Sequence, residues 1–88
     1  MQPVVYVLRC ADGSLYTGWT IDLDRRLREH RAARASKYTR SRLPVELAGC
    51  VTVRTRTEAR QLEAKLKALP RSLKLKFLAG CDQHKRRS

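Results

Sequence analysis

Two short, mainly apolar stretches, VVYVL and LYTGW, lie near the N-terminus with the turn residues ADG between them. Short apolar runs bounded by turn residues are typical of strands, and a turn of this composition favours a hairpin. We expect two antiparallel strands, at about residues 3–10 and 14–19. The first strand is apolar on both faces, which favours a central position with another layer packed on each side.

Two turn geometries are open to this hairpin, and they place Tyr6 and Tyr16 differently because successive side chains in a strand point to opposite faces. A two-residue Asp-Gly turn would put Trp19 opposite Tyr6 and separate the two phenols. A three-residue loop with Gly13 in the left-handed conformation pairs Tyr6 with Gly18, so that both phenols share a face. We predict the second register, because the opposite face is then mostly apolar, with Val5, Val7, Leu15, Thr17 and Trp19.

A helix and a third strand follow the hairpin. The helix is capped by Thr20 or Asp22 and is expected to run to about Arg34. After Pro44, a strand over residues 45–53 keeps a period of two, shown by Val45, Leu47, Val51 and Val53.

The C-terminal half is predicted to be helical. Thr55 and Glu58 match a capping box, and a helix continues from there to about Leu69. Its buried stripe is predicted to contain Ala59, Leu62, Leu66 and Leu69. Pro70 at a first helical position and Gly80 after the last bracket a further short helix. The element order is therefore β-β-α-β-α-α, which places the chain in the α+β class.

The first helix carries two polar residues on the side that faces the sheet. At 100° per residue, Leu23, Leu27 and His30 form a narrow stripe with Arg26 at its edge. Taken singly, Arg26 is explained by an aliphatic stem that covers the edge of the core, and His30 by a half-buried, hydrogen-bonded ring. Their i, i+4 spacing nevertheless brings the two side chains together.

Composition indicates a single domain with an anionic partner. The chain has 88 residues, with 20 Lys and Arg against 8 Asp and Glu, a net charge of +12 and a pI near 10.7. We expect one domain over residues 1–80 and a basic, mobile tail over residues 81–88. Nucleic acid is the first candidate partner, and DNA is favoured over RNA. The sequence contains no membrane-spanning stretch and no signal peptide, so a cytoplasmic location is expected.

Cations surround an aromatic side chain in the segment SKYTRSRL. Such a mixture suits contacts with phosphates and with a base face. A solvated basic loop explains the same segment equally well. The residues predicted to bind nucleic acid are Lys37, Tyr38, Arg40 and Arg42, together with Lys67 on a later helix.

Most familiar catalytic sites are excluded by what the sequence lacks. The eight acids fall mostly in a turn, a cap or exposed helical faces, so a two-metal carboxylate cluster is not expected. There is no P-loop, Rossmann glycine pattern or Gly-x-Ser-x-Gly elbow. Cys10 and Cys50 fall in predicted strands as small hydrophobes. Cys81 and His84 lack the second pair that a four-ligand zinc site needs.

Four short motifs occur in an order that resembles the GIY-YIG nuclease domain. They are Val4-Val5-Tyr6, Tyr16-Thr17-Gly18, Asp22-Leu23-x-x-Arg26-Leu27-x-x-His30 and Glu63-Ala64-Lys65-Leu66-Lys67. Lys37-Tyr38-Thr39 adds a likeness to the small stand-alone bacterial members. The resemblance covers about residues 3–78. The chain departs from the family in having Val4 for glycine, Thr17 for isoleucine and no late asparagine.

The resemblance implies a three-stranded antiparallel sheet flanked by helices and metal-dependent hydrolysis of a phosphodiester. In this scheme Glu63 holds one Mg²⁺ or Mn²⁺ ion, and Mg²⁺ accepts a single protein ligand because it keeps several waters. Tyr6 acts as the base, with Tyr16 and His30 in the proton relay. Arg26 stabilises charge on the phosphoryl oxygens. Gly18, opposite Tyr6, leaves space for a backbone to approach.

The same residues also fit a module that binds nucleic acid without efficient catalysis, whose binding would weaken steeply with salt. A protein-interaction role with an incidental basic face is a third hypothesis. Larger relatives use a separate domain to choose the target, and none is expected here. The substrate would then be unspecific, recognised by shape, or chosen by a partner protein, and RNA stays an alternative to DNA.

Overall fold

The structure, a computed structural model, describes residues 2–81 and the side chains of residues 2–77. The element order is β1 (Val4–Arg9), β2 (Leu15–Thr20), α1 (Leu23–Arg31), α2 (Lys37–Arg40), β3 (Glu46–Thr52), α3 (Arg56–Ala68) and α4 (Arg71–Cys81). This order confirms the α+β class and adds a short helix, α2, that the sequence analysis did not predict. The expected basic tail lies outside the described residues apart from its first residue, and so does His84.

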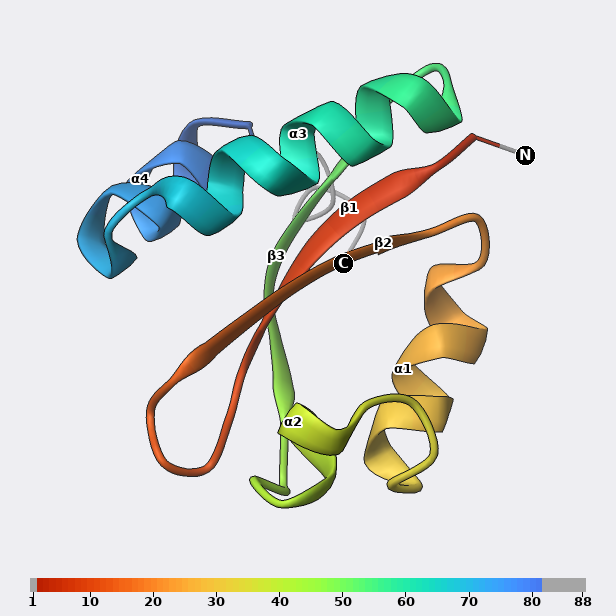
Figure 1. Cartoon of the computed structure of the whole chain (residues 1–88), viewed down its shortest axis with the longest axis vertical. Helices are drawn as coiled ribbons and strands as arrows, with labels where there is room; N and C mark the ends of the chain where they lie inside the picture. The colour runs from red at the N-terminus through yellow and green to blue at the C-terminus, as the bar shows by residue number, and fades with distance from the viewer. Residues whose placement is uncertain (1, 82–88) are drawn as a thin grey trace.

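The three strands form one antiparallel sheet in the order β2-β1-β3, which confirms the central position of β1. Helices α1 and α2 cover one face of the sheet, and α3 and α4 lie on the other (Figure 1). On the α3 side, Val5 and Val7 pack against Ala59 and Leu66. The opposite face of β1 packs Tyr6 and other side chains against α1. None of the described helices is long and apolar enough to cross a bilayer.

The hairpin has the register that a three-residue loop predicts. Tyr6 lies opposite Gly18, so both predicted tyrosines point to the same face. At the turn, the Cys10 N–H donates to the Ser14 carbonyl at 2.9 Å. Gly13 has a φ of +87°, which glycine adopts without a steric penalty.

Strand β3 does not keep its apolar residues on a single face, so the prediction of one period-two pattern was wrong. The register between β1 and β3 shifts by one residue at Ala48, which the pairing skips. Because an extra residue reverses the alternation of faces, Val45 and Leu47 pack on the α1 side whereas Val51 and Val53 pack on the α3 side. Each half of β3 therefore serves a different cluster of the core.

Helix α1 is capped by Asp22, one of the two predicted caps, but it ends at Arg31, before the predicted end at Arg34. It ends there because Ala33 takes a φ of +64°. The Ala33 N–H then donates to the His30 carbonyl and the Arg34 N–H to that of Glu29, which closes the helix in a Schellman motif. Glycine usually marks this position, so an alanine gave no stop signal.

The basic segment after α1 contains the one-turn helix α2, where no helix was expected. The Ser36 hydroxyl oxygen caps it by accepting the N–H groups of Tyr38 and Thr39 at 3.0 and 3.4 Å. At the other end, the Arg42 guanidinium donates to the Tyr38 carbonyl at 3.0 Å. These side chains fix a turn of helix that is too short to be stable alone.

The predicted capping box at Thr55 and Glu58 is confirmed at the start of α3. The predicted stripe packs against the sheet through Ala59, Leu62, Leu66 and Leu69. Helix α4 begins just after Pro70 and runs through Gly80, so the prediction that Gly80 follows the helix was wrong. A single glycine inside a helix costs only about 1 kcal/mol relative to alanine, which does not force an end.

Candidate active site

Tyr6 of β1 and His30 of α1 form a buried hydrogen bond between the sheet and the helix. The Tyr6 hydroxyl oxygen and His30 Nε2 are 2.9 Å apart. The two residues are 1% and 0% exposed. Strand alternation points Tyr6 toward α1, and the helical stripe that contains Leu27 turns His30 toward the sheet. The structure therefore brings together two of the predicted site residues where bulk water does not reach.

Gly18 of β2 makes room for the Tyr6 ring. A Cβ at Gly18 would lie 2.8 Å from the Tyr6 hydroxyl oxygen and 2.9 Å from its Cζ atom. We expected this glycine to leave space for a backbone to approach, but the phenol occupies that space. Gly18 therefore helps to place the Tyr6 hydroxyl at His30.

Tyr16 of β2 extends the site into an aromatic cluster. Its ring centroid lies 6.5 Å from that of Tyr6, 5.2 Å from that of His30 and 5.9 Å from that of Tyr38 on α2. Tyr16 is partly exposed whereas Tyr6 is buried. Of the two phenols, Tyr16 is the one that solvent reaches.

Arg26 of α1 lies between the Tyr6 phenol and a carboxylate. Its Nη1 atom is 2.9 Å from Glu29 Oε1, and Arg25 pairs with the same carboxylate at 3.3 Å. Arg26 is also close enough to Tyr6 to lower the pKa of its phenol. The sequence analysis missed Glu29, although its i+3 spacing from Arg26 was an available signal. The three charged residues line a pocket of about 300 Å³ with Trp19, Thr20, Ile21 and Asp22.

The surroundings keep both partners of the buried hydrogen bond neutral. Burial raises the pKa of the Tyr6 phenol above its ordinary value of 10.0, and the Arg26 hydrogen bond and charge oppose this rise. Burial also lowers the pKa of the His30 imidazole below 6.5, and the positive charge of Arg26 lowers it further. At neutral pH the resting site therefore consists of a phenol and an uncharged imidazole.

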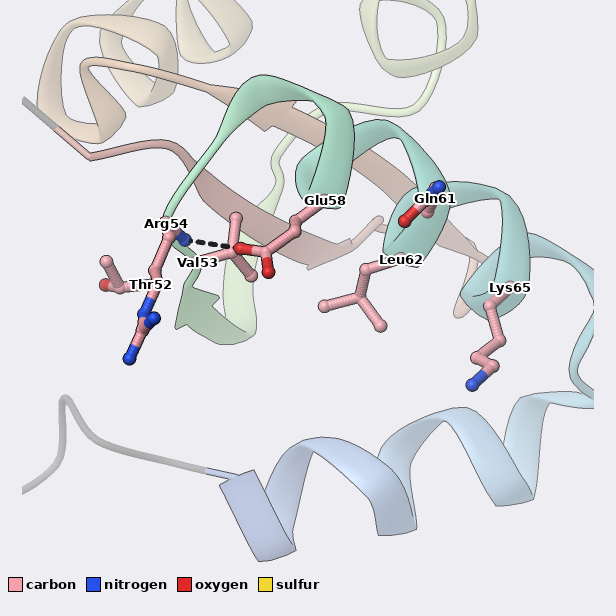
Figure 2. Close-up of a pocket in the computed structure, with 7 residues that line it drawn as sticks. All are labelled: Thr52, Val53, Arg54, Glu58, Gln61, Leu62 and Lys65. Carbon is pink, nitrogen blue, oxygen red and sulfur yellow. Dashed lines mark hydrogen bonds between the residues drawn. The ribbon is translucent and has the colours of Figure 1, made fainter.

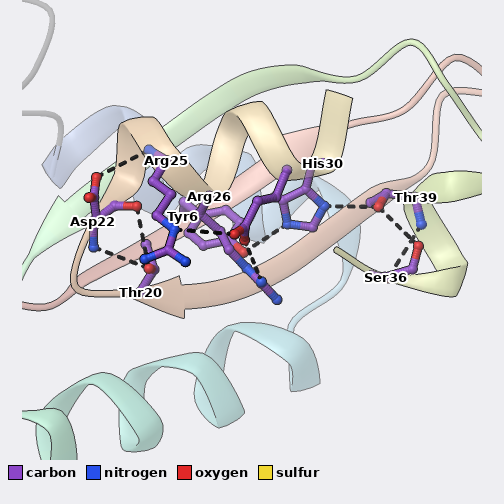
Figure 3. A network of polar contacts seen from close by, with 9 residues as sticks. Tyr6, Thr20, Asp22, Arg25, Arg26, His30, Ser36 and Thr39 are labelled. Carbon is purple, nitrogen blue, oxygen red and sulfur yellow. Dashed lines mark hydrogen bonds and ion pairs between the residues drawn. The ribbon is translucent and has the colours of Figure 1, made fainter. Parts of the chain in front are cut away.

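A second hydrogen bond holds the other nitrogen of His30. His30 Nδ1 lies 2.9 Å from the Thr39 hydroxyl oxygen, and Thr39 is 0% exposed. The Thr39 hydroxyl also donates to the Ser36 carbonyl at 3.4 Å. Figure 3 shows these contacts leading from the sheet through His30 to α2. Thr39 was not predicted to belong to the site, although a cap residue three positions earlier was an available signal.

Glu63 belongs to α3, which packs on the face of the sheet opposite α1. Its negative charge is the smallest of the contributions to the pKa of Tyr6, which it raises. Its side chain is 24% exposed, and its Oε2 atom is 3.5 Å from Lys67 Nζ. Among the described side chains, no three His, Cys, Asp or Glu gather as a metal-binding group. A divalent ion at Glu63 would take its other oxygens from water or a bound phosphate, as Mg²⁺ commonly does.

Two of the residues predicted to bind nucleic acid lie on an open surface beside the site. Lys37 and Arg40 line a pocket of about 190 Å³ together with Arg34. Within the described part of the chain, none of these three cations pairs with a carboxylate. Their charges are available to an anionic ligand.

Arg42 and Tyr38 instead hold the fold together. The Arg42 guanidinium carbon stacks 3.9 Å from the centroid of the Tyr38 ring, and its Nε atom is 3.0 Å from Asp12 Oδ2. Arg42 therefore ties the hairpin turn to α2. One face of the Tyr38 ring is covered by Arg42, which is not the open base platform that the sequence suggested.

A larger pocket, of about 490 Å³, lies beside α3 and contains none of the predicted site residues (Figure 2). Its carboxylate, Glu58, belongs to the capping box. Glu58 Oε1 accepts the N–H groups of Arg54 and Thr55 at 2.9 and 3.3 Å. The polar groups here stabilise the start of α3, so we place the candidate active site at Tyr6 and His30.

A family model described as the GIY-YIG catalytic domain matches residues 2–76, which includes the whole candidate site. The chain belongs to the GIY-YIG family. It is 44% identical over 81 residues to a UPF0213 protein of Streptococcus agalactiae, a match covering 92% of this chain and 89% of that one. It is 46% identical over 82 residues to a UPF0213 protein of Oceanobacillus iheyensis, covering 93% and 95%.

Two solution NMR structures have the same GIY-YIG fold. A protein of E. faecalis gives a TM-score of 0.65 at 39% identity, with 91% of this chain and 85% of that chain covered. A UPF0213 protein of Bacillus halodurans gives 0.57 at 39% identity, with 90% and 84% covered. The GIY-YIG family comprises nuclease domains, which indicates a nucleic-acid substrate. The names of these relatives state no activity.

Proposed function

We propose that this GIY-YIG domain is a divalent-metal-dependent endonuclease that hydrolyses phosphodiester bonds in DNA. The supporting observation is the hydrogen bond of 2.9 Å between Tyr6 and His30, with Arg26 acting on the same phenol. Burying polar groups costs stability unless they are paired, and apolar residues would fill this part of the core more simply. Chemistry is therefore the best explanation for the arrangement.

Tyr6 is the proposed general base. Its proton passes to His30 Nε2, which leaves a phenolate beside an imidazolium. The phenolate then accepts a proton from the water that attacks phosphorus. Because Tyr6 is 1% exposed, we assign the partly exposed Tyr16 to relay that proton between the water and Tyr6. Arg26 favours the phenolate, since its hydrogen bond and its charge lower the pKa of Tyr6.

Arg26 has a second proposed role at the phosphate. Its guanidinium is bound to Glu29 at 2.9 Å in the free protein, and 34% of its side chain is exposed. A phosphate in the adjoining pocket would compete with Glu29 for the same N–H groups. Guanidinium groups pair well with phosphoryl oxygens and stabilise the charge that grows on them in the transition state.

Glu63 is the proposed ligand of one Mg²⁺ or Mn²⁺ ion. Such an ion, when bound, polarises a phosphoryl oxygen and lowers the pKa of a coordinated water. The existing contact of Glu63 with Lys67 is long, at 3.5 Å, and 58% of the Lys67 side chain is exposed. Exposed ion pairs contribute little free energy, so the carboxylate is able to exchange this partner for a metal.

DNA is proposed as the substrate because the chain carries a net charge of +12 and because cations near the site pair with no carboxylate in the part of the chain that the structure describes. Lys37 and Arg40 would contact phosphates on either side of the bond to be cut, together with Arg34. Such contacts position a backbone without selecting a sequence. We propose that target choice comes from DNA shape or from a partner protein.

The test incubates the purified protein with single-stranded, duplex and branched DNA, and with matched RNA, in Mg²⁺, Mn²⁺ or a chelator. Tyr6→Phe and Glu63→Gln should each reduce cleavage by at least about 100-fold, as expected for a lost base or metal ligand. Glu46→Gln is the control, because it removes an equal charge from an exposed carboxylate on β3 whose side chain is 74% exposed. Cleavage that persists in both site variants would contradict the proposal. Salt-sensitive binding without cleavage under any condition would instead support the binding-module hypothesis.

A further inference from the structure

The buried hydrogen bonds around His30 begin at the Tyr6 hydroxyl. Its oxygen lies 2.9 Å from His30 Nε2. The nearby charge of Arg26 is positive, so it does not offer an acceptor for the Tyr6 proton. An Nε2 atom without a hydrogen is the acceptor that this end of the network provides.

The other end of the network stops at a group that can only accept. The Ser36 carbonyl oxygen is 3.4 Å from the Thr39 hydroxyl, which donates its single proton to it. Thr39 is 0% exposed, so bulk water does not compete for that proton. The Thr39 oxygen then accepts from His30 Nδ1 at 2.9 Å. This end requires a hydrogen on Nδ1.

The two ends agree on one tautomer. We infer that Thr39 is a positioning residue that holds His30 with its proton on Nδ1 and with Nε2 bare, facing the Tyr6 hydroxyl. The opposite tautomer would leave both the Tyr6 proton and the Thr39-facing Nδ1 without a suitable partner in the described network, because Tyr6 would lose its acceptor and the Thr39 proton already goes to the Ser36 carbonyl. A buried donor without a partner is costly, so the network favours the first tautomer.

The inference deepens the proposed nuclease function, and its catalytic part rests on that function. With Nε2 bare, one bond breaks and one forms: the Tyr6 O–H bond is lost, an Nε2–H bond is made, and the imidazole becomes an imidazolium. The Nδ1–H···Oγ contact with Thr39 stays in place and stabilises the new positive charge. No other group has to move before the phenol can lose its proton.

Helix α2 supplies the geometry that this role needs. Ser36 caps the helix at one end, and the donation from Arg42 to the Tyr38 carbonyl ties it at the other. Thr39 is thereby held with its hydroxyl between His30 and the Ser36 carbonyl. Ser41→Ala offers a matched control, because it removes a hydroxyl beside the same helix that contacts the Lys37 and Tyr38 carbonyls and not His30.

The test measures the tautomer directly by NMR of the ring nitrogens in ¹⁵N-histidine-labelled protein, at a pH above the titration of His30. A His84→Gln background leaves His30 as the only labelled ring. We expect a protonated Nδ1 and an unprotonated Nε2 in the parent, in Thr39→Ser and in Ser41→Ala. Thr39→Val should move the population toward the Nε2–H form. A parent with Nε2 protonated would overturn the inference, even if Thr39→Val failed to fold.

Kinetics supply the second readout. In the cleavage assay, Thr39→Val should lower kcat by at least about tenfold and change KM less than about threefold, because proton transfer is affected and DNA contacts are not. Thr39→Ser, which keeps the hydroxyl, should restore kcat to within about threefold of the parent. Equal kcat losses in both variants would overturn the catalytic role of the hydroxyl. A parent protein that does not cleave would overturn the proposed function, and the NMR result would then decide the tautomer alone.

Discussion

The ring of Tyr6 lies against Gly18, its partner on the neighbouring strand, where a methyl group would come within 2.8 Å of the phenol oxygen. We expect Gly18→Ala to lower the free energy of unfolding by about 1–3 kcal/mol, because the ring is too rigid to yield. Urea denaturation measures this. In a Tyr6→Leu background the same substitution should cost less, and an undiminished cost would show that the clash lies elsewhere.

Thr17 buries a hydroxyl on the α3 side of the sheet. It is 3% exposed, and its Oγ1 has no hydrogen-bond partner among the described residues. Thr17→Val should therefore stabilise the protein, by about 1 kcal/mol, since an unpaired buried hydroxyl is replaced by a methyl of similar shape. Thr39→Val makes the same chemical change at a hydroxyl that bonds both His30 and the Ser36 carbonyl, and it should destabilise the protein. Denaturation midpoints that move in the same direction would contradict this account.

Ala33 ends α1 with a φ of +64°, a conformation that costs an alanine about 1–2 kcal/mol. Ala33→Gly should relieve this strain, but glycine also makes the unfolded chain more flexible, which favours unfolding. The net effect should be a free energy of unfolding that is higher by about 0.5–1 kcal/mol. The control is Ala32→Gly, because Ala32 has an ordinary φ of −89° and should lose stability. Thermal unfolding of the two variants should show a higher melting temperature for Ala33→Gly and a lower one for Ala32→Gly than for the parent.

The lowered pKa of His30 makes stability depend on pH. Burial is the main cause of the shift below 6.5, so the unfolded chain binds a proton before the folded protein does. The contribution of the neutral His30 to the free energy of unfolding should be complete above pH 6.5. It should decline as the pH falls from 6.5 toward the lowered pKa of His30. The side chains that face the ring are Tyr6, Tyr16, Arg26, Glu29 and Thr39.

Urea titrations between about pH 5 and 8 measure this dependence, in a range where histidine is the side chain expected to titrate. Carboxylates contribute only at lower pH, because hydrogen bonds hold the pKa values of Asp12 and Glu29 below 3.8 and 4.5. The His84→Gln background removes the other histidine. A stability that rises as the pH falls through this range would contradict the burial of a neutral His30.

The basic residues beside the site are expected to differ in their effects. Arg40→Ala and Lys37→Ala should each weaken DNA binding and release about one counterion fewer on binding, since neither side chain pairs with a carboxylate among the described residues. Arg42→Ala should chiefly lower stability, because it loses the stack on Tyr38 and the pair with Asp12. Binding titrations at several salt concentrations, with urea denaturation alongside, separate the two effects. A large loss of affinity with unchanged stability in Arg42→Ala would reverse this assignment.

Local rules were sufficient to predict the hairpin register and the inward side of α1. The turn chemistry around Gly13 and the alternation of strand residues placed Tyr6 and Tyr16 on one face. The helical period likewise placed His30 against the sheet. Both predictions depend on residues that are near one another in the chain.

The features that were missed depend on tertiary contacts. The skipped residue Ala48 leaves no mark in an apolar run, because its neighbours are apolar on both faces of the sheet. Helix α2 is a single turn that its cap and Arg42 hold in place, so its own sequence has little helical signal. The bend after α1 brings Thr39 close to His30, and the sequence did not predict that bend.

Tyr6 and His30 are also among the largest side chains that are fully enclosed in the protein. The groups proposed to perform the reaction are thus part of the scaffold that keeps the molecule folded. Replacing either one by a smaller residue would leave a cavity at the centre of the molecule. A loss of cleavage after such a change would therefore report on folding as well as on chemistry, and the more exposed Glu63 is the cleaner position at which to test the reaction.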